Sequence, residues 1–233
     1  MAEKAKPLSV SEAQRAIYID FEGTAVDPPS LLGVAWFDDD KARFVQYVVE
    51  EDLWPAAEAK SSDHDWDCRK ATWADIVEIR HRAETEQRRV FAWSTHEATA
   101  LGKYVPDEDD REWFAANVEN AIPNAKAWKK ANHPDVVFEK DPKNPYVGKN
   151  RLNRYFRLID YPVPQAFGPG NTAQRIRKVR EMLNNRGGDY SALTGTKKGQ
   201  WTKVLKHNWY DCDGLQKLIL KCAADLETRP ADG

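Results

Sequence analysis

Three β-prone segments follow one another near the start of the chain, and their order constrains the fold more than any other feature of the sequence. Residues 16–23 form a short apolar, β-branched and aromatic run that closes on Gly23, which predicts a buried strand with polar residues at its end. Residues 31–37 and 43–49 predict two further strands, joined by the polar turn 38–41. The chain is therefore expected to open with a three-stranded meander of antiparallel strands.

After the meander, helical periodicity alternates with single strand-like segments. An acidic loop is expected over 50–71, followed by a helix capped by Thr72, a strand over 89–93 and a helix from a cap at Thr95 to Tyr104. Helical structure is expected over 107–132 and a strand over 135–139. The last expected elements are helices over 149–159 and 172–185 and a long final helix over 200–226. This order predicts an α/β fold. Its mixed sheet would hold three antiparallel strands plus one or two parallel strands, flanked by helices, with a helical insertion before the C-terminal helix.

A chain of 233 residues without a compositional break predicts a single domain. Residues 1–15 lack a strong apolar stripe and are interpreted as a mobile N-terminal arm. The domain itself is expected to span 16–226, with a basic helical insertion at about 140–200 and a tail over 227–233.

The distribution of apolar residues and cysteines bears on the cellular compartment. No stretch approaches the roughly 20 apolar residues that cross a bilayer, and the N-terminus lacks the apolar run of a signal peptide. We therefore expect a cytoplasmic protein without a membrane partner. The three cysteines, Cys68, Cys212 and Cys222, share no metal-ligand spacing and are expected to be free thiols.

The net charge of −2 conceals a strongly basic segment. Between Lys140 and Lys206 fifteen Lys and Arg face four Asp and Glu, a local net charge of +11, with aromatic residues interleaved. Such a segment is typical of a surface that follows a phosphate backbone, although a solvated helical face has the same composition. The predicted nucleic-acid contacts are Lys149, Arg151, Arg154, Arg175, Arg177, Lys178, Lys197, Lys198 and Lys203.

Two groups of polar residues at distant positions carry the candidate chemistry. Asp20 and Glu22 are two apart on the first strand, so both side chains point to one face, and two carboxylates that close favour a hard divalent cation such as Mg²⁺ or Mn²⁺. His207 and Asp211 are four apart and share one face of the last helix. Asp211 lies beside an apolar stripe, where an uncompensated carboxylate is costly.

These segments resemble motifs of the DEDD superfamily of ribonuclease H-like exonucleases. The sequences Ile-Tyr-Ile-Asp20-Phe-Glu22-Gly and His207-Asn208-Trp209-Tyr210-Asp211-Cys212 are similar to the first and last motifs, most closely to those of predicted nucleases associated with RecB-type and CRISPR-linked proteins. Val90-Phe91-Ala92-Trp93-Ser94-Thr95-His96-Glu97 resembles the middle motif. The resemblance implies a ribonuclease H-like fold and a nuclease, with 3′–5′ exonuclease action.

The resemblance also implies a set of site residues. Asp20, Glu22, Glu97 and Asp211 would bind two Mg²⁺ or Mn²⁺ ions, with Asp20 bridging them, and His207 would take the proton of the attacking water. The substrate would be DNA or RNA, hydrolysed by the protein alone or within a larger nucleic-acid-processing complex.

Two alternatives remain open from the residues. The middle acid is Glu where the superfamily has Asp, and His207 has the spacing of the tyrosine form of the last motif. Both departures fit a catalytically degraded domain that binds nucleic acid or protein. A small-molecule phosphohydrolase would use the same acids without needing the basic segment.

Overall fold

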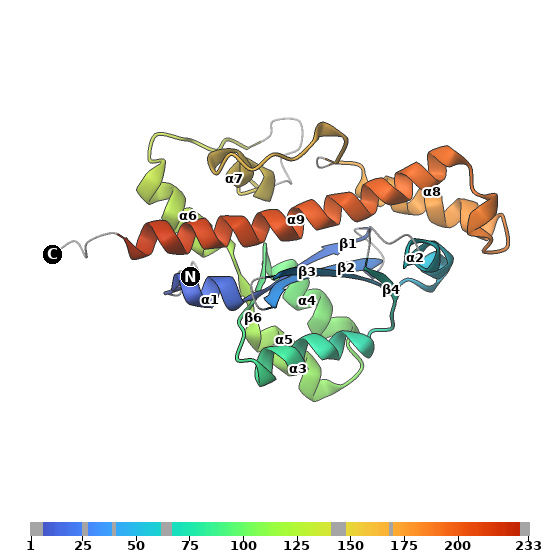
Figure 1. Cartoon of the computed structure of the whole chain (residues 1–233), viewed down its shortest axis with the longest axis horizontal. Coiled ribbons are helices and arrows are strands. Elements are labelled where there is room, and N and C mark those ends of the chain that lie inside the picture. The colour runs from blue at the N-terminus through green and yellow to red at the C-terminus, as the bar shows by residue number, and fades with distance from the viewer. Residues whose placement is uncertain are drawn as a thin grey trace.

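The computed structural model describes residues 7–24, 28–38, 41–61, 67–140, 148–167 and 170–228. This part of the chain has an α/β fold built on a six-stranded mixed sheet in the order β4-β3-β2-β1-β5-β6 (Figure 1). The strands are β1 (Ile17–Glu22), β2 (Leu31–Asp38), β3 (Lys41–Val48), β4 (Cys68–Lys70), β5 (Val90–Ala92) and β6 (Val118–Asn120). β1, β2 and β3 form the antiparallel meander, and the outer strands pair in parallel with their neighbours.

Helices cover both faces of the sheet. The α-helices are α1 (Val10–Arg15), α2 (Trp54–Ser61), α3 (Glu78–Thr85), α4 (Thr95–Tyr104), α5 (Glu108–Asn117), α6 (Ile122–Asn132), α7 (Leu152–Leu158), α8 (Thr172–Asn184) and α9 (Gly195–Glu227). Short 3₁₀ turns are η1 (Glu51–Leu53), η2 (Asp75–Val77), η3 (Gln165–Phe167) and η4 (Tyr190–Ala192). α9 crosses one face of the sheet along the whole molecule, whereas α3, α4 and α5 lie on the other (Figure 1).

The alternation of side chains along β1 decides which face receives the acids. Ile17 and Ile19 are buried in the core that includes residues of α3, α4 and α5, whereas Tyr18 is buried in the core that includes residues of α1, α6, α7 and α9. Because strand residues two apart share a face, Asp20 and Glu22 follow Tyr18 toward α9. The candidate site is thus built on the α9 side of the sheet.

A third core cluster fixes the N-terminal part of α9. α8 and α9 form a hairpin beside α2 at one end of the molecule (Figure 1). Trp201 is fully buried there, and its indole Nε1 donates to the Ala56 carbonyl at 3.1 Å. Arg180 of α8 pairs with Glu50 at 2.7 Å. These contacts hold the start of α9 against the sheet, so that its middle passes over β1.

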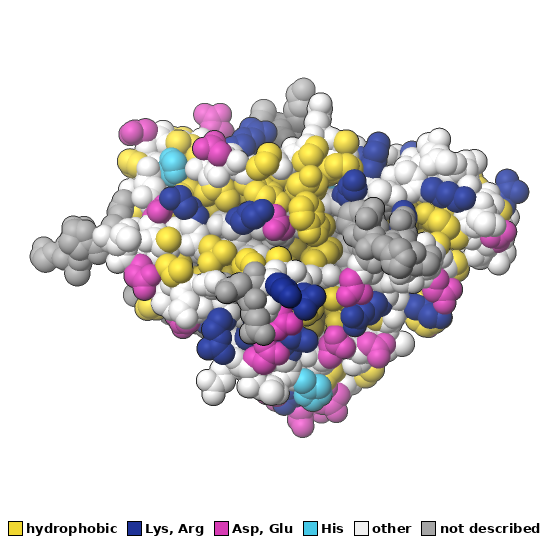
Figure 2. All heavy atoms as spheres, viewed as in Figure 1, with side chains coloured by type: hydrophobic (Ala, Val, Ile, Leu, Met, Phe, Trp, Pro, Cys, Tyr) yellow, Lys and Arg dark blue, Asp and Glu magenta, His cyan; other side chains and the backbone are white. Residues whose placement is uncertain are grey.

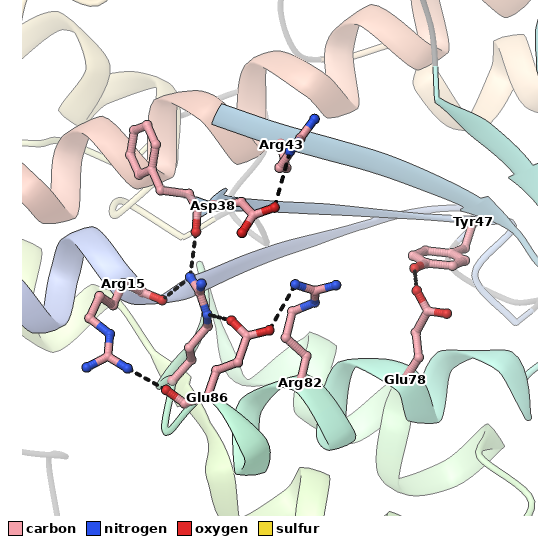
Figure 3. Close-up of polar contacts among 9 residues, drawn as sticks. Arg15, Asp38, Arg43, Tyr47, Glu78, Arg82 and Glu86 are labelled. Carbon is pink, nitrogen blue, oxygen red and sulfur yellow. Dashed lines mark hydrogen bonds and ion pairs between the residues drawn. The ribbon is translucent and has the colours of Figure 1, made fainter. Parts of the chain in front are cut away.

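Polar contacts hold the opposite end of the sheet, where β1 begins and β2 ends (Figure 3). Arg15 donates to the Glu86 carbonyl at 2.6 Å, and Arg82 pairs with the Glu86 carboxylate at 3.1 Å. Tyr47 lies in the row of Phe21, toward the site end of the sheet, where it donates to Glu78 and thereby links β3 to α3. The contacts of Arg15, Arg82 and Glu86 belong to the framework, because they lie at the other end of β1 from Asp20 and Glu22.

The structure corrects several sequence predictions at the edges of the fold. No strand forms over 135–139, where Val137 is 78% exposed. The outer strands are instead β4, in a segment predicted as loop, and β6, in a segment predicted as helix. Each has three residues, which are too few to show the period-two pattern of a strand. The expected acidic loop over 50–71 contains α2 and β4.

Helix boundaries also differ from the predicted ones. Ser94, not Thr95, caps α4, and the turn after Thr72 is η2, which precedes α3. α9 begins at Gly195 after a Thr194 cap, because neither Gly195 nor Gly199 prevents a helix that tertiary packing stabilises.

The predicted mobile arm contains a docked helix. α1 begins with a Ser9–Glu12 capping box, and its Ala13 is fully buried and packs in the same core as α9. The Tyr18 hydroxyl donates to the Ala13 carbonyl at 2.6 Å. A six-residue helix with one buried residue shows no apolar stripe, which explains the difference; residues 1–6 lie outside the described residues.

Two further observations concern the compartment and the thiols. None of the helices in the described ranges is long and apolar enough to span a membrane. The prediction of free thiols is confirmed, since Cys68, Cys212 and Cys222 are buried and unbridged.

Candidate metal centre

The end of β1 and the middle of α9 meet, as the two sequence motifs require. Glu22 is 8% exposed and its Oε1 lies 3.4 Å from His207 Nε2, across 185 residues of chain separation in sequence. His207 Nε2 lies 3.7 Å from Asp211 Oδ2 on the same face of α9. Ligand atoms of Glu22, His207 and Asp211 all lie within 4.8 Å of one another. Asp211 keeps 23% of its side chain exposed, so the group is open to solvent on one side.

Asp20 is held beside this group by Asn208. The Asn208 Nδ2 donates to the backbone carbonyl of Asp20 at 2.9 Å and to its Oδ2 at 3.0 Å. Asn208 is fully buried, and it lies one residue after His207 on α9. The same helical turn therefore supplies one residue to the group and orients the carboxylate of another.

Strand register explains how Asn208 reaches the sheet. Asp20 pairs with Gly33 of β2, and Gly33 pairs with Gln46 of β3, so these three residues form one row beneath α9. A Cβ on Gly33 would lie 2.2 Å from Asn208 Oδ1, closer than any real contact. Glycine at this position is what allows the Asn208 amide to enter the row.

Gln46 completes the row and was not identified from the sequence. Its Nε2 donates to Asn208 Oδ1 at 2.9 Å and to the Leu205 carbonyl at 2.9 Å. Because Asn208 Oδ1 accepts this hydrogen bond from Gln46, the Nδ2 of Asn208 is directed at Asp20. The one signal in the sequence was an amide inside an otherwise apolar strand, Val45-Gln46-Tyr47-Val48.

Replacement of Gln46 by Leu tests this positioning role. The change leaves the buried Asn208 Oδ1 without a donor, which should cost about 1–3 kcal/mol and lower the Tm by several degrees. Thermal unfolding should show this loss, and Mn²⁺ affinity should fall because Asp20 loses its fixed orientation. Gln216→Leu is the matched control: Gln216 is also buried, but its Nε2 has no partner in the described structure, so this change should be neutral or stabilising. Equal stability of the two variants would contradict the role of Gln46.

Glu97 lies in the first turn of α4, after β5. β5 runs parallel to β1, so the carboxyl ends of both strands lie at the same edge of the sheet. Glu97 is 6% exposed, and its Oε2 accepts from Ser94 Oγ at 3.0 Å and Ser94 N at 3.3 Å, as part of a capping box. The local role of Glu97 is therefore to cap α4, and its charge acts on Asp20 and Glu22 from that position.

The four carboxylates make a strongly unfavourable cluster of negative charge. Burial, and then the charges of Glu22, Asp211 and Glu97, raise the pKa of Asp20 well above its usual value, although the bond from Asn208 lowers it. Burial and then the Asp211 and Glu97 charges likewise raise the pKa of Glu22. Burial also raises the pKa of Asp211 and of Glu97. No Lys or Arg of the described ranges forms an ion pair with any of the four; the charges of His207 and Arg175 oppose the rise in the pKa of Asp211 and of Glu22, respectively.

Comparison with protein-family models, with curated proteins and with solved structures found no match for this chain.

The nine predicted nucleic-acid contacts are spread over α7, α8 and the start of α9 or the turns before them. Arg154 and Lys198 have structural partners: Arg154 donates to the Glu139 and Lys149 carbonyls, and Lys198 donates to the Ser191 carbonyl at 2.9 Å. Lys149, Arg177 and Lys203 are exposed. Arg175 is the predicted contact whose charge reaches the acids, since it lowers the pKa of Glu22.

A cleft of about 460 Å³ opens beside β1. It is lined by Glu22 itself, by the residues that follow it and by one side of α4, including His96, Lys103 and Tyr104. Glu22 is thus accessible from this side, whereas His207 and Asp211 line a different cleft on the α9 side.

Proposed function

We propose that the protein is a divalent-metal-dependent nuclease that hydrolyses phosphodiester bonds in DNA or RNA. The observation that carries this proposal is the convergence of Glu22, His207 and Asp211 within 4.8 Å, joined by the Asp20 carboxylate that Asn208 orients. A buried cluster of carboxylates without a Lys or Arg partner is stable only when a cation or protons compensate it.

The donor set suits Mg²⁺ or Mn²⁺. Both ions prefer oxygen ligands, and the site offers the carboxylates of Asp20, Glu22 and Asp211. The imidazole Nε2 of His207 faces the carboxylates of Glu22 and Asp211 and lies beside these oxygen donors. Glu97 would contribute its charge from the α4 cap. By resemblance, two ions bind.

Hydrolysis requires a nucleophile derived from water and neutralisation of charge on the leaving oxygen. Bound divalent ions supply both by lowering the pKa of water and by stabilising the leaving oxygen. Within the proposal, His207 would accept the proton of the attacking water at Nε2, which lies beside Glu22 and Asp211. The carboxylates of Asp20, Glu22 and Asp211 would offset the positive charge of the bound ions, and Asn208 keeps the Asp20 side chain in place. By resemblance the action is that of a 3′–5′ exonuclease.

The position of Arg175 is a reason to expect a polyanionic substrate. Its Nη1 is buried without a partner among the described residues, and its positive charge is felt by Glu22. A guanidinium with an unused donor beside a metal site is suited to a substrate phosphate.

Arg175→Ala is expected to lower kcat by about tenfold or more, because the guanidinium would act on the phosphate under attack. Arg177→Ala, on the same helix but exposed, should mainly weaken binding and reduce its salt dependence. Steady-state kinetics at two salt concentrations separates the two effects. Identical profiles for both variants would contradict the special role of Arg175.

A cleavage assay tests the proposed function. Labelled single- and double-stranded DNA and RNA are incubated with protein and Mn²⁺ or Mg²⁺, and parallel samples contain a chelator. The proposal predicts cleavage of at least one polymer that depends on the metal. Absence of cleavage from all four substrates, with the protein folded and the metal present, would overturn it.

One observation favours the second candidate, a nucleic-acid-binding module without catalysis. Glu97 is engaged in the cap of α4, and neither Asp20 nor Glu97 belongs to the compact group of Glu22, His207 and Asp211. A module of this kind would bind nucleic acid with normal affinity but show no calorimetric signal on titration with Mn²⁺.

A further inference from the structure

The first turn of α8 presents hydrogen-bond donors that the helix itself does not satisfy. Its N-cap residue, Asn171, makes no side-chain hydrogen bond to the turn, and no Asp or Glu lies within it. The first N–H groups of a helix point out of its end and have no acceptor within the helix. Because α8 has thirteen residues, its peptide dipoles also give this end a positive potential. The turn therefore favours an anionic acceptor.

Thr172 is a buried polar side chain in this turn that has no partner. It is the first residue of α8 and is only 7% exposed, yet its Oγ1 has no hydrogen-bond partner in the part of the chain that the structure describes. A buried hydroxyl without a partner costs free energy that a bound ligand can recover. Because Thr172 belongs to the first turn, its hydroxyl lies beside the N–H groups of that turn.

Arg175 brings a full positive charge to the same end of α8. It lies three residues after Thr172, so the two side chains share one face of the helix. Its Nη2 donates to the Ala166 carbonyl at 3.3 Å, whereas its buried Nη1 has no partner among the described residues. Backbone N–H groups, a hydroxyl and a guanidinium together form a set of donors that matches the oxygens of a phosphate group.

The packing of α8 brings this end of the helix near the end of β1. Ile176, the residue after Arg175, is fully buried in the same core cluster as Leu31, and Leu31 pairs with Glu22 across β1 and β2. The charge of Arg175 opposes the rise in the pKa of Glu22 that burial causes. Figure 2 shows Lys and Arg side chains exposed on the end of the molecule that α8 and the start of α9 form. The donors of α8 therefore lie near the candidate metal centre.

We propose that the first turn of α8, with Thr172 and Arg175, binds the substrate phosphate under attack at the metal centre; this inference rests on the proposed function. The carboxylates of the metal centre repel an anion, so donors outside the cluster are needed to hold a phosphate beside it. The N–H groups of the turn and the Thr172 hydroxyl would supply them. Contacts to phosphate oxygens carry no sequence information, so the turn would bind the backbone of DNA and of RNA alike.

Calorimetric titration with inorganic phosphate in Mg²⁺ tests the inference without requiring cleavage. Thr172→Val replaces the hydroxyl with a methyl group and should weaken phosphate binding by about tenfold. Its Tm without phosphate should stay unchanged or rise, because a buried hydroxyl that has no partner does not stabilise the fold. Arg175→Gln should weaken binding at least as much. Thr202→Val is the matched control: its hydroxyl donates to the Lys198 carbonyl at 3.2 Å within α9, so phosphate affinity should not change.

The outcomes separate this inference from the proposed function. Equal phosphate affinity of wild type and Thr172→Val, or no phosphate binding by wild type, overturns the inference. If Thr172→Val fails to fold by circular dichroism, Arg175→Gln decides: a loss of about tenfold supports the inference, and an unchanged affinity overturns it. A protein that cleaves polymers but whose phosphate affinity does not depend on Thr172 loses only this inference. A protein with Thr172-dependent phosphate binding but without metal-dependent cleavage loses only the proposed function.

Discussion

Asparagine in place of Asp20 is expected to reduce metal-dependent phosphodiester hydrolysis by about a thousandfold or more, which corresponds to roughly 4 kcal/mol of transition-state stabilisation. The amide has the same shape as the carboxylate, and its oxygen can still accept from Asn208 Nδ2, the donor to Asp20 Oδ2 in the native protein. The variant therefore loses the negative charge of the carboxylate but keeps the hydrogen bond from Asn208 Nδ2. Initial rates on labelled oligonucleotides measure the effect.

Stability measurements make the Asp20 experiment interpretable. Removal of one charge from a buried cluster of like charges should leave the Tm in chelator unchanged or raised. Asp38→Asn is the matched control, because Asp38 also ends a strand but lies at the opposite end of the sheet and pairs only loosely with Arg43 at 3.6 Å. This control should retain full activity. Equal cleavage by wild type and Asp20→Asn would indicate a contaminating nuclease and remove the enzymatic proposal.

Alanine at Gly33 is expected to have the largest effect on stability of any single methyl group added to this site. Its Cβ would lie 2.2 Å from Asn208 Oδ1 and 2.8 Å from Asn208 Cγ, and the Asn208 amide is fully buried and held by hydrogen bonds to Gln46 and Asp20. Overpacking of this kind should cost about 1–3 kcal/mol and lower the Tm by roughly 2–12 °C. Activity should fall as well, because α9 would be displaced from β1.

A second substitution identifies the clash as the cause. In Gly33→Ala/Asn208→Ala the obstructing amide is gone, so part of the lost stability should return, whereas activity should not, because Asp20 remains unoriented. Gly102→Ala is the control: its Cβ would meet Ala115 Cβ at 3.8 Å, an ordinary contact between α4 and α5. That change should be neutral or stabilising. Similar unfolding temperatures for Gly33→Ala and Gly102→Ala would show that the row beneath Asn208 is not tightly packed.

The sequence predicted the framework of the site because its signals are local. The period-two pattern of β1 placed Asp20 and Glu22 on one face, and the period of α9 placed His207 and Asp211 on another. The two pairs of residues meet because β1 and α9, which carry them, both have strong apolar patterns. The mixed sheet with an antiparallel meander followed from the same patterns, and the structure confirms both.

The remaining features depend on contacts between residues far apart in the chain. Gly33 and Gln46 join the site only through the register of three strands, which no local pattern specifies. The strands β4 and β6 are each three residues long and exist because a neighbouring strand supplies their partners. The sequence also did not reveal that Glu97 caps α4, although Ser94 and Glu97 have the spacing of a capping box.

Diffraction from crystals grown with Mn²⁺, recorded with the anomalous signal of the metal, shows whether the acidic cluster binds a cation. We expect an anomalous peak coordinated by the carboxylates of Glu22 and Asp211, with Asp20 adjacent and still bonded to Asn208. An absence of any peak at this position in Mn²⁺-saturated crystals, or carboxylates paired with Lys or Arg side chains instead, would contradict it.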